Sequence, residues 1–255
     1  MRDAVLRYCR LALHSLIRQP GFTLTVVGML GVAIGATTAI FSLINGALLH
    51  ALPFEAPERL VMGRATFGGE INPTVSGYDY YDYREHSRSF ETLAAMGGGA
   101  GPVTVLVDRQ PDRANAMFVT WDLFPTLRVG PVLGRSFVES DAAAGHDGVA
   151  VISHGYWQRR FGGSADVLNR EAVVNGTPVT IVGVMPATFH FMFDVDVWRL
   201  TFRDGPLANA RRFHNLLLVG RLAPGVTLAQ AQADVDVISS RLEQQYPDSN
   251  RDKGL

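Results

Sequence analysis

The sequence has almost none of two residues that many enzymes and secreted domains depend on, cysteine and lysine. Cys9 is the only cysteine among 255 residues, so neither an intrachain disulfide nor a cysteine metal cluster can form. Lys253 is the only lysine among 23 basic residues and stands in DKGL at the end of the sequence, where no phosphate-binding loop can use it. The chain therefore carries no ATP-binding loop of its own, and a formal net charge of −1 indicates no bias toward nucleic acid.

Charge is also missing from one long stretch, because residues 21–54 contain no aspartate, glutamate, lysine or arginine. From Phe22 to Leu49 this run would form a helix of about 42 Å, whereas the hydrocarbon core of a membrane is about 30 Å thick. A cleaved signal has a shorter apolar region that ends at small residues, but this run continues past Gly35 and Ala36. The sequence therefore predicts a transmembrane helix over residues 21–51.

Charges on the two sides of this span predict its orientation. Four arginines precede it against the single acid Asp3, whereas Glu55, Glu58 and Arg59 follow it. Because positive residues favour the cytoplasmic side, we expect residues 1–20 in the cytoplasm and the chain after about residue 51 outside it.

Residues 1–20 are expected to form a basic amphipathic helix that lies along the inner membrane surface. One helical face carries Arg7, Arg10, His14 and Arg18, and Pro20 breaks this helix from the span. Two roles fit the basic face, a topology anchor and a contact with a cytoplasmic partner subunit.

Small residues recur every three or four positions in the predicted span, at Gly28, Gly31, Gly35 and Ala39. This spacing lets a second helix approach closely. We therefore expect the span to pack against another helix rather than to serve as a lone anchor.

The residues after the span alternate between helical and strand patterns, which predicts an α+β domain. Residues 76–96 read as one or two helices that begin at Ser76, with Asp79 in capping-box spacing. Short helices are expected at 121–127 and directly after Ser153. Strands are expected at 102–108, 114–120, 149–153 and 215–222, with a turn over 109–113 and a hairpin at 171–185 around Asn175-Gly176.

The last predicted helix begins at Thr227, with Gln230 in capping-box position. Its apolar residues follow a 3-4-3-4 spacing, so one face must pack, most simply on a sheet. The final segment YPDSNRDKGL shows no closing element, so the sequence looks cut there rather than finished.

Two groups of residues superficially resemble catalytic or metal sites, but neither fits a known motif. Ser153 stands beside His154, yet residue 151 is valine where a nucleophile elbow needs glycine, so Ser153 is better explained as a helix cap. His190, Asp194 and Asp196 lack the spacing of a known metal site, and the alternation in DVDVW favours a strand with its aspartates facing water.

Four tyrosines cluster among acids at Tyr78, Tyr80, Tyr81 and Tyr83. On a helix they occupy more than one face, so we expect some in the core and some exposed, with a carbohydrate or peptide face as the alternative. We expect no catalytic residue, no metal and no bound cofactor in this chain.

Taken together, the segments resemble the permeases of the MacB/FtsX family of ABC transporters, more closely their acidobacterial-type branch. The resemblance begins with RQPGFTLTVVGMLGVAIGATTAIFSLINGALLHALPFEAPERLV. It continues in the family's order through FVTWDLFPTLRVGPVLGRSFVESD, VAVISHGYWQRRFGG, VNGTPVTIVGVMP and VGRLAPGVTLAQAQADVDVISSRLEQQYPDSN. It covers nearly the whole chain, which therefore looks like an N-terminal fragment of such a permease.

The resemblance implies a two-lobed periplasmic core domain at a bacterial inner membrane. The first lobe would comprise residues 52–104 and 206–255, and a strand-rich lobe would be inserted at 105–205. The implied partners are an ABC ATPase that binds the ATP, a second permease copy or half, and the membrane, with a periplasmic adaptor as a further candidate. The implied mechanism is mechanical, since ATP hydrolysis on the partner would move the outer domain to export or extract a substrate.

Two other functions also fit parts of the sequence. A single-pass, membrane-anchored binding or adaptor module explains the span and the outer domain equally well. A membrane-anchored hydrolase would need Ser153 or the group of His190, Asp194 and Asp196, whose motifs fail.

Overall fold

The computed structural model describes residues 21, 24–25, 28–32, 35, 54–143, 148–203 and 210–255. The chain divides into two compact units, Met1–Leu52 and Pro53–Leu255. In the first unit the described residues are helical, and Thr25 Oγ1 donates to Gly21 O at 2.9 Å across one helical turn. Among the described residues, no helix combines the length and the apolar character needed to cross a membrane.

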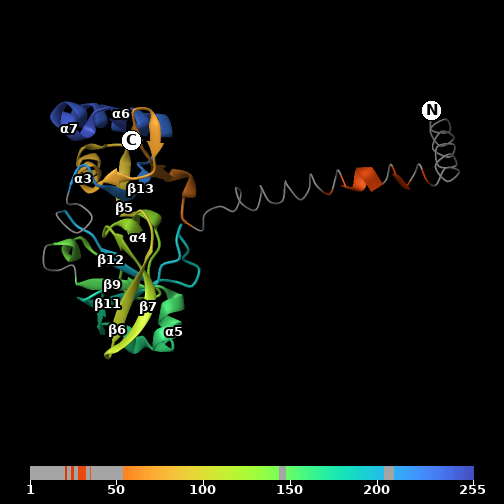
Figure 1. Ribbon diagram of the computed structural model, residues 1–255, viewed down its shortest axis with the longest axis vertical. Coiled ribbons are helices and arrows are strands. Elements are labelled where there is room, and N and C mark those ends of the chain that lie inside the picture. The colour runs from red at the N-terminus through yellow and green to blue at the C-terminus, as the bar shows by residue number, and fades with distance from the viewer. Residues whose placement is uncertain are drawn as a thin grey trace. The chain divides into compact units, whose positions relative to one another are not determined.

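Six strands of the second unit close into a ring, here called the barrel (Figure 1). Its order is β7-β12-β9-β11-β10-β6, and β6 pairs back with β7. The strands are β6 (Gly101–Val107), β7 (Gln110–Val119), β9 (Val149–Ile152), β10 (Glu171–Val174), β11 (Thr177–Val184) and β12 (Val197–Leu200).

The barrel interior is a core of small and branched side chains. Alternate residues face inward, among them Val105, Ala114, Ile152, Val174 and Ile181, all nearly inaccessible to solvent. Helix α5 (His154–Phe161) adds Tyr156 to this core. Arg160 on α5 donates to Val107 O and Gln110 O at the β6–β7 turn, so α5 covers that end of the barrel.

Four further strands form a second part of the fold, here called the helix-covered sheet. They are β1 (Leu60–Gly63), β4 (Val75–Ser76), β5 (Phe90–Gly97) and β13 (His214–Leu222). β13 lies between β1 and β5, and β4 pairs with the start of β13. Helices α3 (Gly77–His86) and α6 (Leu228–Gln245) bury Tyr80, Tyr83, Val235, Ile238 and Leu242 in one core with residues of this sheet.

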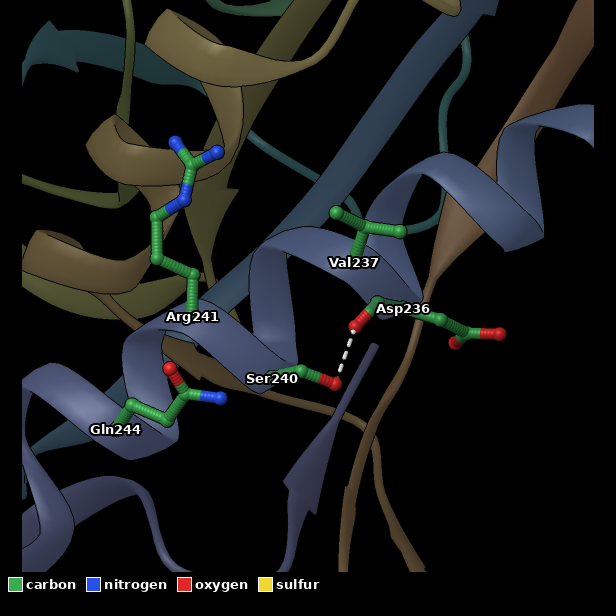
Figure 2. Close-up of a pocket in the computed structure, with 5 residues that line it drawn as sticks. All are labelled: Asp236, Val237, Ser240, Arg241 and Gln244. Atoms are coloured by element: carbon green, nitrogen blue, oxygen red, sulfur yellow. Dashed lines mark hydrogen bonds between the residues drawn. The ribbon is translucent and has the colours of Figure 1, made fainter.

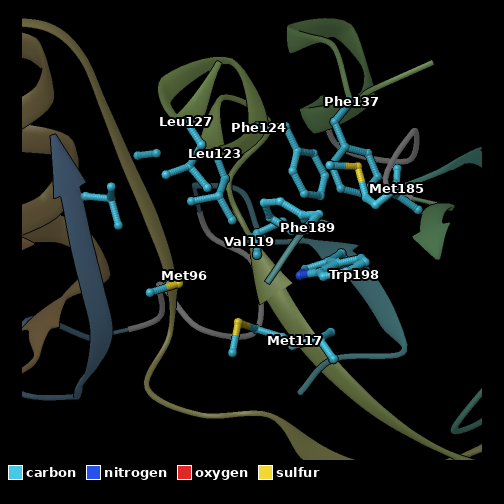
Figure 3. Packing of buried hydrophobic residues seen from close by; sticks show 14 of the residues in the cluster. Met96, Met117, Val119, Leu123, Phe124, Leu127, Phe137, Met185, Phe189 and Trp198 are labelled. Carbon is cyan, nitrogen blue, oxygen red and sulfur yellow. The ribbon is translucent and has the colours of Figure 1, made fainter. Parts of the chain in front are cut away.

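The barrel and the helix-covered sheet meet over a third core, here called the central core and shown in Figure 3. Helix α4 (Leu123–Leu127) contributes Leu123, Phe124 and Leu127 to it, and β12 contributes Trp198. The remaining short elements are η1 (Pro57–Arg59), β2 (Ala65–Phe67), β3 (Glu70–Asn72), β8 (Leu133–Gly134), η2 (Glu139–Ala142), η3 (Ala165–Val167), α7 (Pro247–Asn250) and β14 (Lys253–Gly254).

The predicted caps at Ser76 and Thr227 and the Asn175-Gly176 turn are confirmed. Asp79 N donates to Ser76 Oγ at 3.1 Å, and Thr227 with Gln230 forms the predicted capping box. Asn175 and Gly176 have φ values of 48° and 84°, the left-handed pair that a two-residue hairpin requires. The strands predicted near 102, 149 and 215 and the short helices near 121 and 154 are also present.

Three local predictions are wrong. Residues 90–96 belong to β5 rather than to a helix, because β5 is covered on both faces and buries Leu93 to Met96 as one continuous run. The turn predicted at 109–113 is only Asp108-Arg109, so β7 begins at Gln110. The last ten residues, for which the sequence predicted no element, form α7, which packs on α6, and β14, which pairs with β2 in a small sheet with β3.

Gly134 is expected to be the glycine least tolerant of a side chain. Its φ is +76°, and a Cβ there would lie 2.2 Å from Val182 O, whereas a Cβ at Gly162, with φ +59°, meets nothing within 4 Å. We expect Gly162→Ala to lower the free energy of unfolding by about 1–2 kcal/mol. Gly134→Ala should lose about 1–3 kcal/mol more from overpacking. Urea unfolding of both variants checks this, and equal losses would contradict it.

Candidate functional site

Residues 54–59, here called the attachment segment, connect the predicted span to the outer domain and are bound to it by several contacts. Phe54 is buried, and its ring packs edge-on against Phe191 with centroids 5.6 Å apart. Ala56 has a left-handed backbone with φ 47°, which turns the chain into η1. Arg59 N donates to Ala56 O at 3.1 Å and closes that turn.

Arg221 holds the attachment segment from inside the domain. It lies on β13 and is only 1% exposed. Its Nε donates to Thr126 O at 2.8 Å at the end of α4, and its Nη1 donates to Ala56 O at 3.1 Å. Burial lowers the pKa of the guanidinium, and the nearby Arg128 and Arg59 lower it further. One buried side chain thus joins a strand, a helix and the attachment segment.

An alternating chain of charges covers the same place at the surface. Arg128 pairs with both Glu55 and Glu91, at 3.2 Å from Glu91, and Arg59 pairs with Glu91 in turn. Arg59 Nε also donates to Leu222 O at 2.9 Å on β13. The hydrogen bonds from Arg59 and Arg128 lower the pKa of Glu91. Exposed pairs of this kind contribute little each, so the buried Arg221 contacts matter more to the attachment.

The aromatic rings of the central core contact one another, and Figure 3 labels Phe124, Phe189 and Trp198 among them. Phe54 contacts Phe189 at 6.4 Å between centroids, and Phe189 contacts both Phe124 and Trp198 at 5.7 and 5.6 Å. Such edge-on aromatic pairs add about 0.5–1.5 kcal/mol each beyond their buried area. Aromatic ring contacts therefore connect the attachment segment, through Phe189, to α4 and to β12 of the barrel.

A family profile described as the MacB-like periplasmic core domain matches residues 22–238. The chain belongs to this family. The family is the periplasmic domain of ABC-transporter permeases and is not itself a catalytic domain. No curated protein shows significant sequence similarity to the chain.

Solved structures of MacB-like domains share the fold. A domain described as that of a permease protein from Porphyromonas gingivalis has a TM-score of 0.59 at 17% identity, covering 79% of this chain and 90% of its own. The periplasmic region of MacB from Actinobacillus actinomycetemcomitans has a TM-score of 0.54 at 12% identity, covering 76% and 86%. The extracellular domain of YknZ, a noncanonic ABC-type transporter of Gram-positive bacteria, has 0.55 at 10%, covering 76% and 98%.

The residues of the predicted span and cytoplasmic helix are only partly described in this MacB-like chain. Gly28, Gly31 and Gly35 are helical and exposed, and a Cβ on any of them meets nothing within 4 Å. Ala39 and the predicted basic face lie outside the described residues, as does Cys9; the basic face comprises Arg7, Arg10, His14 and Arg18. Helix packing at these positions stays a prediction.

Ser153 and Asp196, which superficially resembled parts of catalytic or metal sites, have structural roles. Ser153 Oγ accepts from Tyr156 N at 3.1 Å and caps α5, as predicted. Asp196 accepts from Asn115 N at 2.9 Å and pairs with Arg159 at 3.0 Å. Asp194 and Asp196 precede β12 rather than lying on it, and within the described residues they do not converge with His190 on a common point.

The tyrosine cluster divides as predicted between the core and the surface. Tyr80 and Tyr83 are buried, and their hydroxyls bond Leu93 O at 3.2 Å and Ser239 Oγ at 2.8 Å. Tyr78 and Tyr81 are half-buried, and arginine side chains lie over both rings. One face of each of these two rings is thus already covered by a guanidinium.

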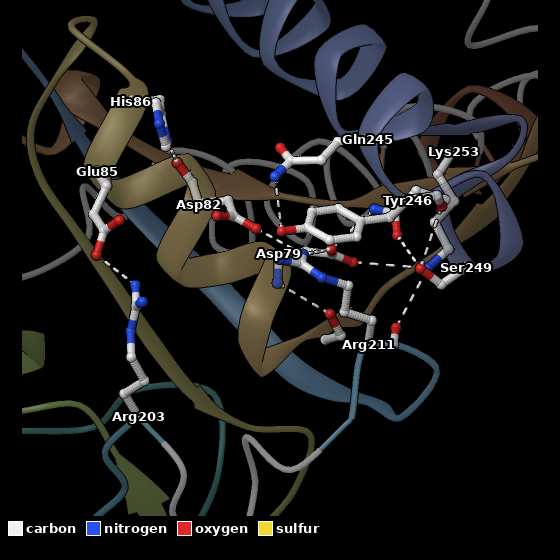
Figure 4. Close-up of polar contacts among 12 residues, drawn as sticks. Asp79, Asp82, Glu85, His86, Arg203, Arg211, Gln245, Tyr246, Ser249 and Lys253 are labelled. Atoms are coloured by element: carbon white, nitrogen blue, oxygen red, sulfur yellow. Dashed lines mark hydrogen bonds and ion pairs between the residues drawn. The ribbon is translucent and has the colours of Figure 1, made fainter.

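The side chains of Asp82, Glu85 and His86 bring potential metal ligands together on α3. Ion pairs already occupy both carboxylates, since Asp82 lies 2.6 Å from Arg211 and Glu85 pairs with Arg203 (Figure 4). The outer face of α6 offers no enclosed site either. Figure 2 shows a shallow surface of side chains from this one helix, with Ser240 Oγ donating to Asp236 O at 3.0 Å.

Sequence reasoning missed a buried polar cluster that fixes the last residues of the chain (Figure 4). Asp79 is buried and accepts from Arg211 and Asn250, both at 2.9 Å, and lies 3.7 Å from Lys253. Lys253 Nζ in turn lies 2.9 Å from His214 Nε2. Because the ammonium can only donate, His214 is neutral with Nε2 unprotonated. The only lysine of the chain is thus structural.

We expect Arg221→Met to lower the free energy of unfolding by about 1–3 kcal/mol, because it leaves the buried Thr126 carbonyl without a donor and removes one of the two donors to Ala56 O. Glu55→Gln, which breaks only an exposed ion pair, should lose less than about 1 kcal/mol. Urea unfolding measures both, and trypsin cleavage after Arg59 should become faster in Arg221→Met alone. Equal stabilities and equal cleavage rates would show that Arg221 does not hold the attachment segment.

His214 is expected to make stability depend on pH. Burial and the neighbouring Lys253 lower the pKa of His214 below its ordinary value. Above about pH 6.5 both folded and unfolded states are neutral at this residue, and stability is complete. Below it the unfolded chain takes up a proton first, so stability falls with a slope of at most about 1.4 kcal/mol per pH unit.

Unfolding at pH 7.5 and pH 5.5 tests this dependence. His214→Gln keeps an acceptor for Lys253 but cannot titrate, so it should show a smaller loss between the two values. His190→Gln, at an exposed position, should behave as the unsubstituted chain does. An unchanged loss in His214→Gln would refute the assignment.

Proposed function

We propose that the chain is the N-terminal part of a permease subunit of a MacB/FtsX-type ABC transporter. Residues 21–51 would anchor it in a bacterial inner membrane, with residues 1–20 in the cytoplasm and the domain outside. A partner ATPase would hydrolyse ATP, and the domain would move with a second permease copy to export or extract a substrate. Membership of the MacB-like family and the charge asymmetry around residues 21–51 support this assignment.

The observation that carries the proposal is the rigid attachment of residues 54–59. Only residues 52 and 53 separate the predicted span from Phe54, which is already buried in the domain core. A binding domain held on a membrane needs no such connection and works as well on a flexible linker. A domain that is moved by its span needs a connection without slack.

The contacts of this segment predict how motion would be distributed. Arg221 ties Ala56 to β13, so the helix-covered sheet would follow the span through hydrogen bonds. The rings of Phe54, Phe189 and Trp198 reach β12, so the barrel would follow through packing. Both parts of the domain would therefore receive the movement at one point.

We expect the outer domains of the transporter to change their separation with the nucleotide state. Spin labels at Ile71→Cys, a 67% exposed position on β3, would report the distance between two copies in a Cys9→Ser background. In complexes with the co-purified ATPase, addition of ATP and vanadate should shift this distance. A Gly-Ser-Gly-Ser insertion between residues 52 and 53 should abolish the shift while ATP hydrolysis continues.

The same insertion between Gly68 and Gly69, in the exposed β2–β3 turn, is the matched control and should leave the shift intact. A shift that survives the insertion at residue 52 would refute rigid transmission. Failure of any ATPase to co-purify, with no change in distance, would favour the anchored binding or adaptor module instead.

A further inference from the structure

Helix α6 packs one face on the helix-covered sheet and leaves the opposite face, here called the outer face, to solvent. The packed face carries Val235, Ile238 and Leu242. On the outer face Val237 is 62% exposed (Figure 2). A single exposed valine is common on protein surfaces and needs no partner. The residues around Val237, however, follow a pattern that does indicate one.

The outer face of α6 carries residues at the spacing of a helix–helix seam. Ala233, Val237, Ser240 and Gln244 are separated by four, three and four positions, and all of them are exposed. This is the alternation of d and a positions in a coiled coil, with Val237 and Gln244 at a and Ala233 and Ser240 at d. Residues at this spacing form one stripe along a helix, which is the line on which a second helix packs.

Two opposite charges lie on the two sides of this stripe. Asp236 occupies the g position before Val237, and Arg241 occupies the e position after Ser240. Figure 2 shows the two charged side chains pointing away from each other. In a parallel pair of helices each g residue lies opposite the next e residue of the other helix, so Asp236 would meet Arg241 of a second copy. In an antiparallel pair g meets g and e meets e, so like charges would face each other.

Both charges are available for such a pair. Arg241 is exposed and has no ion pair or hydrogen bond from its side chain within the described residues. Asp236 Oδ1 accepts from the neutral amide of Gln232 at 2.9 Å, and among the residues described no cation pairs with this carboxylate. Ser240 Oγ donates to Asp236 O at 3.0 Å on its own helix, so its hydroxyl needs no partner across the seam.

The seam is short and has one large apolar residue, so the contact it provides is weak. Stable complexes bury about 1,200–2,000 Å², more than a helix pair of this length offers. Two copies anchored in the same membrane, however, are present to each other at a high effective concentration, which makes a weak contact effective. The inference rests on the proposed function for this shared membrane.

We propose that the outer face of α6 pairs with the same face of α6 in a second copy of the chain, with the two helices parallel. Val237 packs against Val237 of the other copy, and Asp236 pairs with Arg241 once on each side of the seam, as two-fold symmetry requires. The small side chains of Ala233 and Ser240 let the helices approach closely. Because the contact is weak, it can form and break as the outer domains move.

Disulfide cross-linking of the full chain in lipid vesicles tests the pairing without any ATPase. In a Cys9→Ser background, Ser240→Cys places a thiol on the seam. Gln245→Cys is the matched control, an exposed position on the same helix but outside the seam. With copper-phenanthroline as oxidant we expect Ser240→Cys to link at least about tenfold faster than Gln245→Cys, because the pairing holds its two thiols together. Equal rates would overturn the proposal.

Charge reversal tests the direction of the pairing. Asp236→Arg alone or Arg241→Asp alone places like charges on both sides of the seam, so each should slow linking at Ser240→Cys about tenfold. Both substitutions in one chain restore the opposite charges and should restore the rate, which also shows that the variants fold. Arg113→Asp, the same change of net charge at an exposed position on β7, should leave the rate unaltered. A double variant that links as slowly as the single ones would refute a parallel pair.

These outcomes are separable from those of the proposed function. Preferred linking at Ser240→Cys with no ATPase co-purified would support the pairing and count against the transporter. A nucleotide-dependent distance between outer domains, with equal linking at Ser240→Cys and Gln245→Cys, would support the transporter and overturn the pairing.

Discussion

The whole domain depends on how β7 is shared between its neighbours. β6 pairs with β7 only up to Ala116, and β5 then takes the same edge at a single position, Met96 opposite Val119. Thr120 strengthens this junction, since its backbone N donates to Ala95 O at 2.8 Å and its Oγ1 accepts from Ala95 N at 2.9 Å. Within the sheet, one pair of residues and one threonine therefore join the barrel to the helix-covered sheet, and the central core packs across the same junction.

This narrow junction explains why a cavity lies beside the bend between β5 and β6 and why glycines line it. β5 and β6 are consecutive strands on one edge of β7, so the chain between them must bend away and return within a few residues. Gly98 fits this bend closely. Its backbone N donates to Asn215 O at 2.7 Å, and a Cβ at this position would lie only 3.3 Å from the same oxygen. β5 and β6 diverge at this point. The cavity beside this bend, lined by Gly99, Gly101 and Phe118 among others, is here called the barrel mouth.

The sequence predicted features that depend on neighbouring residues and missed those that depend on distant ones. The caps at Ser76 and Thr227 and the Asn175-Gly176 hairpin follow from local hydrogen bonds and backbone preferences, which neighbours determine. The sequence predicts helix at β5 because its alanines and Leu93 show no alternation of polar and apolar residues when both faces are buried. Arg221 stands in LLLVGRLAPG, where one arginine in an apolar strand was the available signal. Its carbonyl partners on residues 56 and 126 could not be read from any pattern.

The two faces of β7 connect the attachment segment with the barrel mouth. Val119 belongs to the central core with Phe54, and Phe118, the next residue, faces the cavity beneath Arg199. Met117 touches both regions, because it is buried in the central core and also lines the cavity. A close-packed core transmits a displacement rather than absorbing it. Under the proposed function, movement delivered at Phe54 would therefore reach β7, the strand that borders both the central core and the cavity.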